Sequence, residues 1–230
     1  MKLRLGGCTH QGTVRNENQD AFLTGGRLIQ LGEAEELADW PVDNVRWVAV
    51  ADGMGGHDEG RLASRMVLEA VASIQEAEQE DVQRTLSSLH REMVSRGNLG
   101  STLTAIALKG TRVSLVHVGD SRLYRHVEGY LTLLTHDDAE ESQGRTLLTA
   151  CIGGGVLEPL RWTWMDTVGF ESGCRFLLCT DGLTAVLSAE RIEEIIGQNV
   201  PSPEGRLVEA AVGAGAPDNV TALVVEFVKE

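Results

Sequence analysis

Two stretches of the chain repeat apolar residues every three or four positions. They are Arg61–Ala77 and Asp81–Arg96. This spacing predicts two amphipathic helices, each packing one face against a core. The apolar positions are Ala63, Val67, Val71 and Ile74 in the first, and Val82, Leu86, Leu89 and Met93 in the second.

Short apolar runs bounded by turn residues predict strands in much of the remaining chain. The best marked is a run that ends in Asp-Gly, which is typical of a buried strand entering a turn. Dipeptides that contain glycine separate four consecutive apolar runs; they are Lys109-Gly110, Gly119-Asp120 and Glu128-Gly129. This pattern favours hairpins and antiparallel sheet over alternating strand and helix. The expected strands are Trp47–Asp52, Ser101–Leu108, Arg112–Val118, Ser121–His126, Tyr130–Leu134, Pro159–Val168, Arg175–Thr180 and Asn219–Val228.

Further helices are expected in the last fifth of the chain. Their ranges are Leu183–Leu187, Ala189–Ile196 and a segment that runs from Ser202-Pro203 to Val212. Serine followed by proline is typical of an N-cap with proline in the first helical position. The acidic segment Gly32–Asp43 has the polarity of a surface loop, and we expect one there.

Length and charge narrow the class of protein. The chain has 230 residues, so we expect one domain over residues 1–230. Its net charge of -14 argues against binding nucleic acid or an anionic membrane, because both need patches of Lys and Arg. We find neither a signal peptide nor an apolar run of membrane-spanning length, so no membrane insertion is expected. The four cysteines form no CxxC pair, and the default expectation is a cytoplasmic protein with reduced thiols.

Five aspartates lie where an apolar run stops or a polar turn begins. They are Asp20 in NENQDAF, Asp52 in ADGMGGH, Asp120 in VGDSRLYR, Asp181 in LLCTDGL and Asp218 in APDNVT. Any one Asp-Gly is usually only a turn. Several gathered in one cleft would repel each other, and divalent cations relieve that repulsion. Ligands that are all oxygen favour Mg²⁺ or Mn²⁺ over zinc.

The sequence resembles the metal-dependent protein phosphatase family, the type 2C serine/threonine phosphatases, in its bacterial form. Seven blocks stand in the order of the family and span nearly the whole chain. They are VRNENQDAF (14–22), VAVADGMGGHDEG (48–60), GSTLTAI (100–106), VGDSRLYR (118–125), LTACIGG (148–154), FLLCTDGL (176–183) and PDNVTALVV (217–225). The resemblance implies an α+β fold, a central β-sandwich of two antiparallel sheets flanked by helices in four layers (α/β/β/α).

The resemblance also implies a site that holds two Mn²⁺ or Mg²⁺ ions. Asp52 would bridge the ions, the backbone carbonyl of Gly53 would be a ligand, and Asp20 would act through water. Asp181 and Asp218 would bind the first ion, and Asp120 would bind a weaker third ion together with Asp181. Asn219 would orient its neighbouring loop without binding an ion.

The resemblance implies hydrolysis of phosphoserine and phosphothreonine without a covalent enzyme intermediate. A hydroxide held between the two ions would attack phosphorus, with Arg15 and Asp52 as the catalytic residues. Arg15 would bind the phosphate, because a planar guanidinium can contact two oxygens at once. The implied partners are phosphorylated Ser/Thr proteins and a bacterial Ser/Thr kinase that the enzyme opposes.

Three departures from the family pattern bear on the site. Met54 stands where some members have a histidine proposed as general acid. The segment LTHDDAEESQGRTLLTACIGG is too short for the usual helical flap, and LTACIG replaces LTRALG, so the usual arginine is missing. We hypothesise that losing the flap opens the cleft and weakens the third ion site.

Two other functions remain open from the residues. One is a non-catalytic, phosphatase-like regulatory module, which would be expected to lose some bridging carboxylates. The other is a metal-dependent hydrolase of small phosphate esters. Turnover of an aryl phosphate and of a phosphopeptide, with Mn²⁺ and with chelator, separates these functions.

Overall fold

The structure is a computed structural model that describes residues 2–39, 46–55, 58–110, 112–142, 145–155, 159–166 and 173–228. Strands dominate the order of elements, and the helices come in two groups. The elements are β1 (Lys2–His10), β2 (Asp20–Thr24), β3 (Arg27–Ile29), β4 (Gly32–Asp39), β5 (Arg46–Met54), α1 (Asp58–Ala72), α2 (Gln79–Ser95), β6 (Gly100–Ser101), β7 (Leu103–Lys109), β8 (Arg112–Val118), β9 (Arg122–Val127), β10 (Tyr130–Leu133), β11 (Ala139–Ser142), β12 (Arg145–Leu148), β13 (Ile152–Gly153), β14 (Thr163–Met165), β15 (Arg175–Cys179), α3 (Asp181–Thr184), α4 (Ala189–Gly197), α5 (Pro203–Gly213) and β16 (Val220–Val228).

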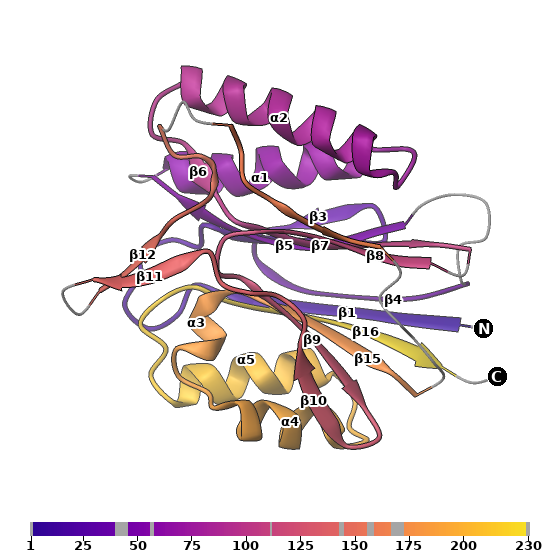
Figure 1. The fold of residues 1–230 in the computed structure, drawn as a ribbon. Helices are drawn as coiled ribbons and strands as arrows, with labels where there is room; N and C mark the ends of the chain where they lie inside the picture. The colour runs from indigo at the N-terminus through magenta and orange to yellow at the C-terminus, as the bar shows by residue number, and fades with distance from the viewer. Residues whose placement is uncertain are drawn as a thin grey trace.

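Two antiparallel sheets stacked face to face form the centre of the molecule (Figure 1). Within the described residues, one sheet has the strand order β10-β9-β15-β16-β1-β4. The other has the order β13-β6-β5-β7-β8-β14, with β2 paired to β5 and β3 paired to β2. Helices α1 and α2 cover the outer face of the second sheet, and α3, α4 and α5 cover the first (Figure 1). The predicted α+β fold, a sandwich of two antiparallel sheets flanked by helices, is confirmed.

Strand alternation explains why the protein has three buried apolar layers. In β5, Val48 and Val50 face the other sheet, whereas Trp47, Ala49 and Ala51 face α1 and α2. Both faces of the strand are therefore covered, which accounts for a continuous apolar run in the sequence. A third layer packs the first sheet against α3, α4 and α5.

At one end of the sandwich, the layer between the two sheets changes from apolar to polar. Along the inward face of β5, Asp52 follows Val50, and along β2 Asp20 precedes Phe22. The same alternation brings threonines and a histidine to this face of neighbouring strands. The inward-facing polar residues at this end are Thr9, Asp20, Asp52, Thr102, Thr104, His117, Ser121, Thr180 and Thr221.

The acidic segment Gly32–Asp43, expected as a surface loop, was wrongly assigned. Its first part, Gly32–Asp39, is strand β4, which pairs antiparallel with β1 at the edge of the first sheet. An edge strand exposes one of its sides, so it accommodates Glu33 and Glu35, both exposed, and still buries Ala34. Residues 40–43 lie outside the described residues.

Other differences concern element length. The strand expected at Pro159–Val168 is confined to Thr163–Met165, which pairs with Leu115–His117 of β8, and residues 167–168 lie outside the described residues. The helix expected at Leu183–Leu187 is shorter and begins at Asp181. Pro203 does begin α5, but the Ser202 hydroxyl donates to Glu204 Oε1 at 2.9 Å instead of capping the helix.

None of the described helices is both long and apolar enough to cross a lipid bilayer.

Candidate active site

Asp20 and Asp52 stand directly opposite each other on the paired strands β2 and β5. Opposite residues of an antiparallel pair have Cα atoms roughly 4.5–5.5 Å apart and share one face. The Asp52 amide donates to Thr102 Oγ1 at 2.9 Å, and the Thr102 amide donates to the Asp52 carbonyl at 2.9 Å. These two hydrogen bonds hold the backbone of Asp52 against Thr102, the residue between β6 and β7 of the same sheet.

Gly53 is glycine because two backbone segments pass close to it. A Cβ at this position would lie 1.9 Å from the Gly60 carbonyl oxygen and 2.8 Å from that of Gln19. The Gly53 amide donates to the Gln19 carbonyl at 3.3 Å, which joins the end of β5 to the loop before β2. The Ser64 hydroxyl of α1 donates to the same carbonyl at 2.6 Å.

The Asp20 carboxylate is fully buried, and only one of its two oxygens accepts hydrogen bonds within the described residues. Its Oδ2 accepts hydrogen bonds from Thr180 Oγ1 at 2.8 Å and from Thr221 Oγ1 at 2.7 Å. Its Oδ1 has no hydrogen-bond partner among the described residues. Burial raises the pKa of Asp20 to about 7, and the charges of Asp181 and Asp218 add to this rise while the two threonine hydroxyls oppose it.

Asp52, Asp120 and Asp181 lie close enough to influence one another. Burial is the main cause that raises the pKa of Asp52, followed by the charges of Asp20 and Asp181. The pKa of Asp120 rises to about 7 through burial and the charge of Asp181. At Asp181, the first residue of α3, burial again raises the pKa and the charge of Asp218 adds to this, while the interaction with Asp52 opposes it. A group of buried carboxyls with raised pKa values lacks compensating positive charge.

Asp218 is partly exposed and makes an ion pair with Arg15. Arg15 Nε donates to Oδ1 at 2.8 Å, and one terminal nitrogen donates to Oδ2 at 2.6 Å. This contact is the main cause that raises the pKa of Arg15, and the charges of Asp52 and Asp181 add to it. Arg15 therefore lies at the open side of the carboxyl group.

Asn219 orients the neighbouring loop, as predicted. Its Oδ1 accepts from the Gln19 amide at 2.8 Å. Its Nδ2 donates to the carbonyls of Gln11 and Glu17, both at 2.9 Å. One side chain therefore ties the start of β16 to both ends of the loop that carries Arg15.

The structure brings the predicted residues to one end of the sandwich without closing them around an ion. Among the described residues, no three carboxyl, imidazole or thiol groups are close enough together to hold a metal as they stand. Both oxygens of Asp218 accept from Arg15 in this arrangement. The assignment of ligands to particular ions stays a prediction.

Sequence reasoning missed the hydroxyl groups that support the carboxyls. Thr180 and Thr221 contact Asp20, and Thr102 contacts the Asp52 amide. Each continues the inward face of a strand whose other inward residues are apolar, such as Leu178 and Leu223. A threonine at the polar end of a period-two apolar pattern was the available signal.

The short segment in place of the expected flap forms a hairpin of β11 and β12 (Figure 1). No helix occurs between Leu134 and Gly153 in the residues described there. The segment is anchored at its base, because Asp138 Oδ2 accepts from the Gly119 amide at 3.0 Å and the Asp138 amide donates to the Gly119 carbonyl at 2.7 Å. The hairpin thus begins beside the turn that carries Asp120.

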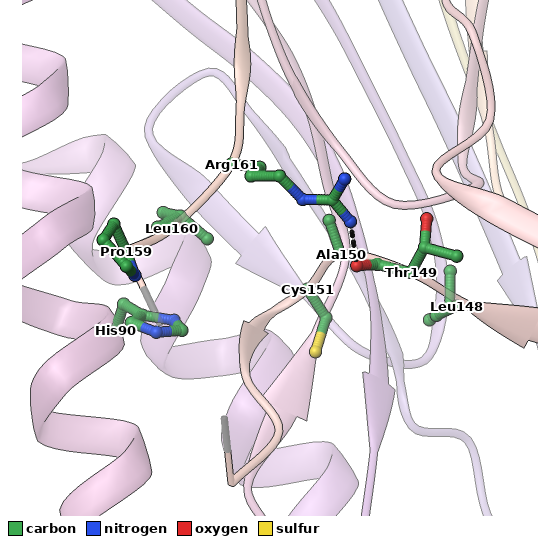
Figure 2. Close-up of a pocket in the computed structure, with 8 residues that line it drawn as sticks. All are labelled: His90, Leu148, Thr149, Ala150, Cys151, Pro159, Leu160 and Arg161. Atoms are coloured by element: carbon green, nitrogen blue, oxygen red, sulfur yellow. Dashed lines mark hydrogen bonds between the residues drawn. The ribbon is translucent and has the colours of Figure 1, made fainter. Parts of the chain in front are cut away.

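A pocket of about 100 Å³ lies next to the segment LTACIG, where the family arginine is missing. Figure 2 shows Arg161 reaching from a different part of the chain toward this segment, where it donates to the Thr149 carbonyl beside Ala150. None of the predicted site residues lines the pocket. Its lining consists of His90, Leu148, Thr149, Ala150, Cys151, Pro159, Leu160 and Arg161.

Residues 35–205 match the family model described as protein phosphatase 2C. The match includes Asp52, Asp120 and Asp181, whereas Arg15 and Asp218 fall outside it.

Similar proteins cover the chain more fully. The serine/threonine protein phosphatase PstP of Mycobacterium tuberculosis is 32% identical over 98% of this chain, which spans 45% of that protein's length. The serine/threonine phosphatase stp of Listeria monocytogenes is 29% identical over 95% of this chain and 93% of its own. A crystal structure of the PstP catalytic domain in complex with two manganese ions is 30% identical, covers both chains completely and has a TM-score of 0.74. With its four-layer sandwich, its gathered aspartates and a family match over most of its length, the chain belongs to the protein phosphatase 2C family.

Proposed function

We propose that this chain is a metal-dependent protein serine/threonine phosphatase that hydrolyses phosphoserine and phosphothreonine. The observation that carries the proposal is the gathering of Asp20, Asp52 and Asp181, from segments far apart in the sequence, at the polar end of the layer between the sheets. Asp120 and Asp218 lie within range of the same charges, and Arg15 stands beside them. The names of the bacterial relatives support the substrate class.

The donor set fits divalent cations. Asp20 Oδ1 and Asp181 Oδ1 are buried and have no hydrogen-bond partner in the described part of the chain. Buried carboxylates need positive charge nearby, and ligands that are all oxygen favour Mg²⁺ or Mn²⁺. The two manganese ions in the PstP structure support a pair of ions here. We assign Asp52, the Gly53 carbonyl, Asp181 and Asp218 to the pair, Asp20 to contact through water, and Asp120 to a weaker third ion.

When bound, such a pair of cations would lower the pKa of a water molecule toward neutral pH and offset the charge of the phosphoryl group. The protein's own groups do the remaining work. Arg15 binds two phosphate oxygens with its planar guanidinium. Thr180 and Thr221 hold the Asp20 carboxylate, and Asn219 holds the loop that carries Arg15. The apolar layer behind Asp52 excludes water from the inner side of the site.

We further propose that the enzyme acts in the cytoplasm and opposes a bacterial Ser/Thr kinase. The bacterial sources of its relatives support this setting. All four cysteines are free, which agrees with a reducing compartment.

The experiment is turnover of a phosphothreonine peptide and of an aryl phosphate by the purified chain, with Mn²⁺ or with chelator. We expect Mn²⁺-dependent release of phosphate from the peptide and nearly complete loss in Asp52→Asn and Asp218→Asn. Loss of a ligand should cost more than the ~10–100-fold typical of residues that only support ligands. The matched control is Asp81→Asn, a partly exposed carboxylate on α2 that pairs with Arg84.

Three results would contradict the proposal. Turnover that survives in Asp52→Asn would remove the metal assignment. Hydrolysis of the aryl phosphate alone would indicate a small-ester hydrolase. Manganese binding without turnover of either substrate would indicate a non-catalytic module.

A further inference from the structure

His117 is a buried imidazole with no role in the proposed chemistry. It lies on β8, is 1% exposed and stands three residues before Asp120. It continues the inward face that begins with Val113 and Leu115 in the apolar layer between the sheets. A polar ring in this position needs partners, because burying an unpaired donor or acceptor is costly.

Each ring nitrogen of His117 contacts one oxygen. Nδ1 lies 3.0 Å from Thr104 Oγ1, on the neighbouring strand β7. Nε2 lies 3.0 Å from the carbonyl oxygen of His136, in the segment that leads to the β11–β12 hairpin. The ring therefore bridges the second sheet and this segment.

Counting hydrogens decides the direction of both contacts. Thr104 Oγ1 also lies 2.7 Å from the Ser121 carbonyl oxygen, which can only accept. This contact is shorter than the 3.0 Å contact with Nδ1, and we assign the single hydroxyl hydrogen of Thr104 to it. Thr104 must then accept from His117 Nδ1–H. The His136 carbonyl can only accept from Nε2–H. A neutral imidazole carries one N–H. In a neutral Nε2–H ring, Nδ1 would accept the Thr104 hydrogen and the Ser121 carbonyl would lose it, so all three contacts are hydrogen bonds at once only when His117 is an imidazolium.

The charges around the ring act in opposite directions. Burial is the largest influence and lowers the pKa of His117 below its usual value, and the carbonyl of His136, the carboxylates of Asp138 and Asp137 and the carbonyl of Gly119 offset only part of this. Asp137 is bound by the guanidinium of Arg122, with a shortest contact of 2.7 Å. Asp138 accepts from the Gly119 amide. Burial by itself favours the neutral ring, so the charged form is assigned on geometry: only the imidazolium makes the contacts of Thr104 with Nδ1 and Ser121 and of Nε2 with His136 hydrogen bonds together.

The contacts of His117 belong to a chain of hydrogen bonds that reaches Asp52. The Asp52 amide donates to Thr102 Oγ1, which lies 2.8 Å from Ser121 Oγ. Ser121 follows Asp120 and receives the hydrogen bond from Thr104. His117 thus connects the strand behind Asp52, the turn of Asp120 and the base of the hairpin.

We propose that His117 is a positioning residue whose imidazolium donates to Thr104 and to the His136 carbonyl, and so fixes the turn of Asp120 relative to Asp52. The inference rests on the proposed function for its effect on turnover, because Asp120 and Asp52 are placed there as ion ligands. The protonation state and the hydrogen bonds are properties of the folded chain and need neither metal nor turnover.

The first test is ¹⁵N NMR of the metal-free protein at neutral pH. We expect the ring of His117, assigned by the signals missing in His117→Gln, to show a hydrogen on both nitrogens. A ring with one unprotonated nitrogen would overturn the double-donor assignment.

The second test compares His117→Leu, which removes both donors, with His117→Gln, whose amide NH₂ can still donate. For His117→Leu we expect kcat for an aryl phosphate to fall by roughly tenfold or more, because small misplacements of reacting groups are costly. KM should be nearly unchanged. His117→Gln should recover part of the loss. Amide exchange at Gly119 and Asp138, whose amides bond across the turn, should be faster in His117→Leu.

The matched control is His126→Leu. His126 is also buried, at 7% exposed, and lies on β9 beside Gly197 of α4. This variant should keep kcat and the exchange rates of Gly119 and Asp138. Normal kcat and exchange in His117→Leu would overturn the positioning role. An inactive wild-type chain would instead count against the proposed function, while the NMR and exchange results would still decide the inference about His117.

Discussion

Arg15 and Asp218 hold each other through two parallel contacts, Nε to Oδ1 at 2.8 Å and a terminal nitrogen to Oδ2 at 2.6 Å. In the proposed function, Arg15 binds phosphate and Asp218 binds an ion. The pair limits Arg15 most, because the N–H groups that it donates to Asp218 cannot donate to a phosphate at the same time. A cation at Asp218 would weaken the attraction between this carboxylate and the guanidinium, and so favour the turn of Arg15 toward a phosphate.

Arg15→Ala should mainly weaken substrate binding. Charge-assisted hydrogen bonds contribute about 1.5–3 kcal/mol, so KM for a phosphopeptide should rise roughly tenfold or more, with a smaller fall in kcat. Arg15→Lys should restore little, because an ammonium cannot contact two oxygens in the same planar way. Steady-state kinetics at saturating Mn²⁺ checks this, and an unchanged KM in Arg15→Ala would remove Arg15 from substrate binding.

The stability of the metal-free protein should fall as pH rises. Burial is the main cause that raises the pKa values of Asp20 and Asp120 to about 7. Their pKa values in the unfolded chain are about 4. Between about pH 4 and pH 7, the folded state binds more protons than the unfolded state, so the free energy of unfolding decreases with increasing pH. Thermal melts in chelator should show Tm decreasing over this window.

Adding Mn²⁺ should raise Tm, and the increase should be larger at pH 8 than at pH 5, because ions compete with protons for the carboxyls. Asp20→Asn is the matched variant, since it removes one titrating group and should flatten the decrease in chelator. A Tm that falls equally with pH in Asp20→Asn would show that Asp20 does not contribute.

Thr180→Val and Thr221→Val should each destabilise the protein. Each removes one hydroxyl that donates to Asp20 Oδ2. A buried acceptor that loses a donor costs about 1–3 kcal/mol. Urea unfolding measures the loss, and the double variant should deviate from additivity because both hydroxyls serve one oxygen. Thr163→Val, at an exposed position of β14, is the control and should change stability little.

A third ion at Asp120 should bind weakly. The hairpin of β11 and β12 replaces the helical flap in which relatives are expected to carry further ligands. Anomalous scattering from crystals soaked in Mn²⁺ should show two strong sites and a partial one near Asp120. Full occupancy there at low Mn²⁺ concentration would contradict the hypothesis, and Asp120→Asn should leave the two strong sites intact.

The sequence was most informative where one residue pattern had one structural solution. The apolar run that ends at Asp52 predicted a buried strand, and β5 is buried on both faces. The hairpins β7–β8 and β9–β10 followed from glycine turns between apolar runs, and the two amphipathic helices became α1 and α2. These features depend on neighbours in the sequence, so local periodicity was sufficient. The expected hairpin at Gly119-Asp120 was wrong, because β8 and β9 lie in different sheets and this turn crosses between them.

Elements that depend on distant partners were harder to predict. Strand β4 reads as an acidic loop because it lies at a sheet edge, where only its pairing with β1 makes it a strand. β1 itself contains two glycines, which lack the side chains that mark a strand. The adjacency of Asp20 and Asp52 comes from the register of β2 on β5, and no spacing along the chain indicates it. The family resemblance supplied that relation.

The pairing of β1 with β16, which extends from Lys2–Val228 to His10–Val220, has a consequence for biosynthesis. Arg15 and Asp20 follow the first of these strands, whereas Asp218 directly precedes the last one and Thr221 belongs to it. During translation the early residues leave the ribosome long before their partners do, and contacts this far apart in sequence close late. The nascent chain should therefore stay without hydrolytic activity until the strand after Asp218 has emerged and inserted into the sheet.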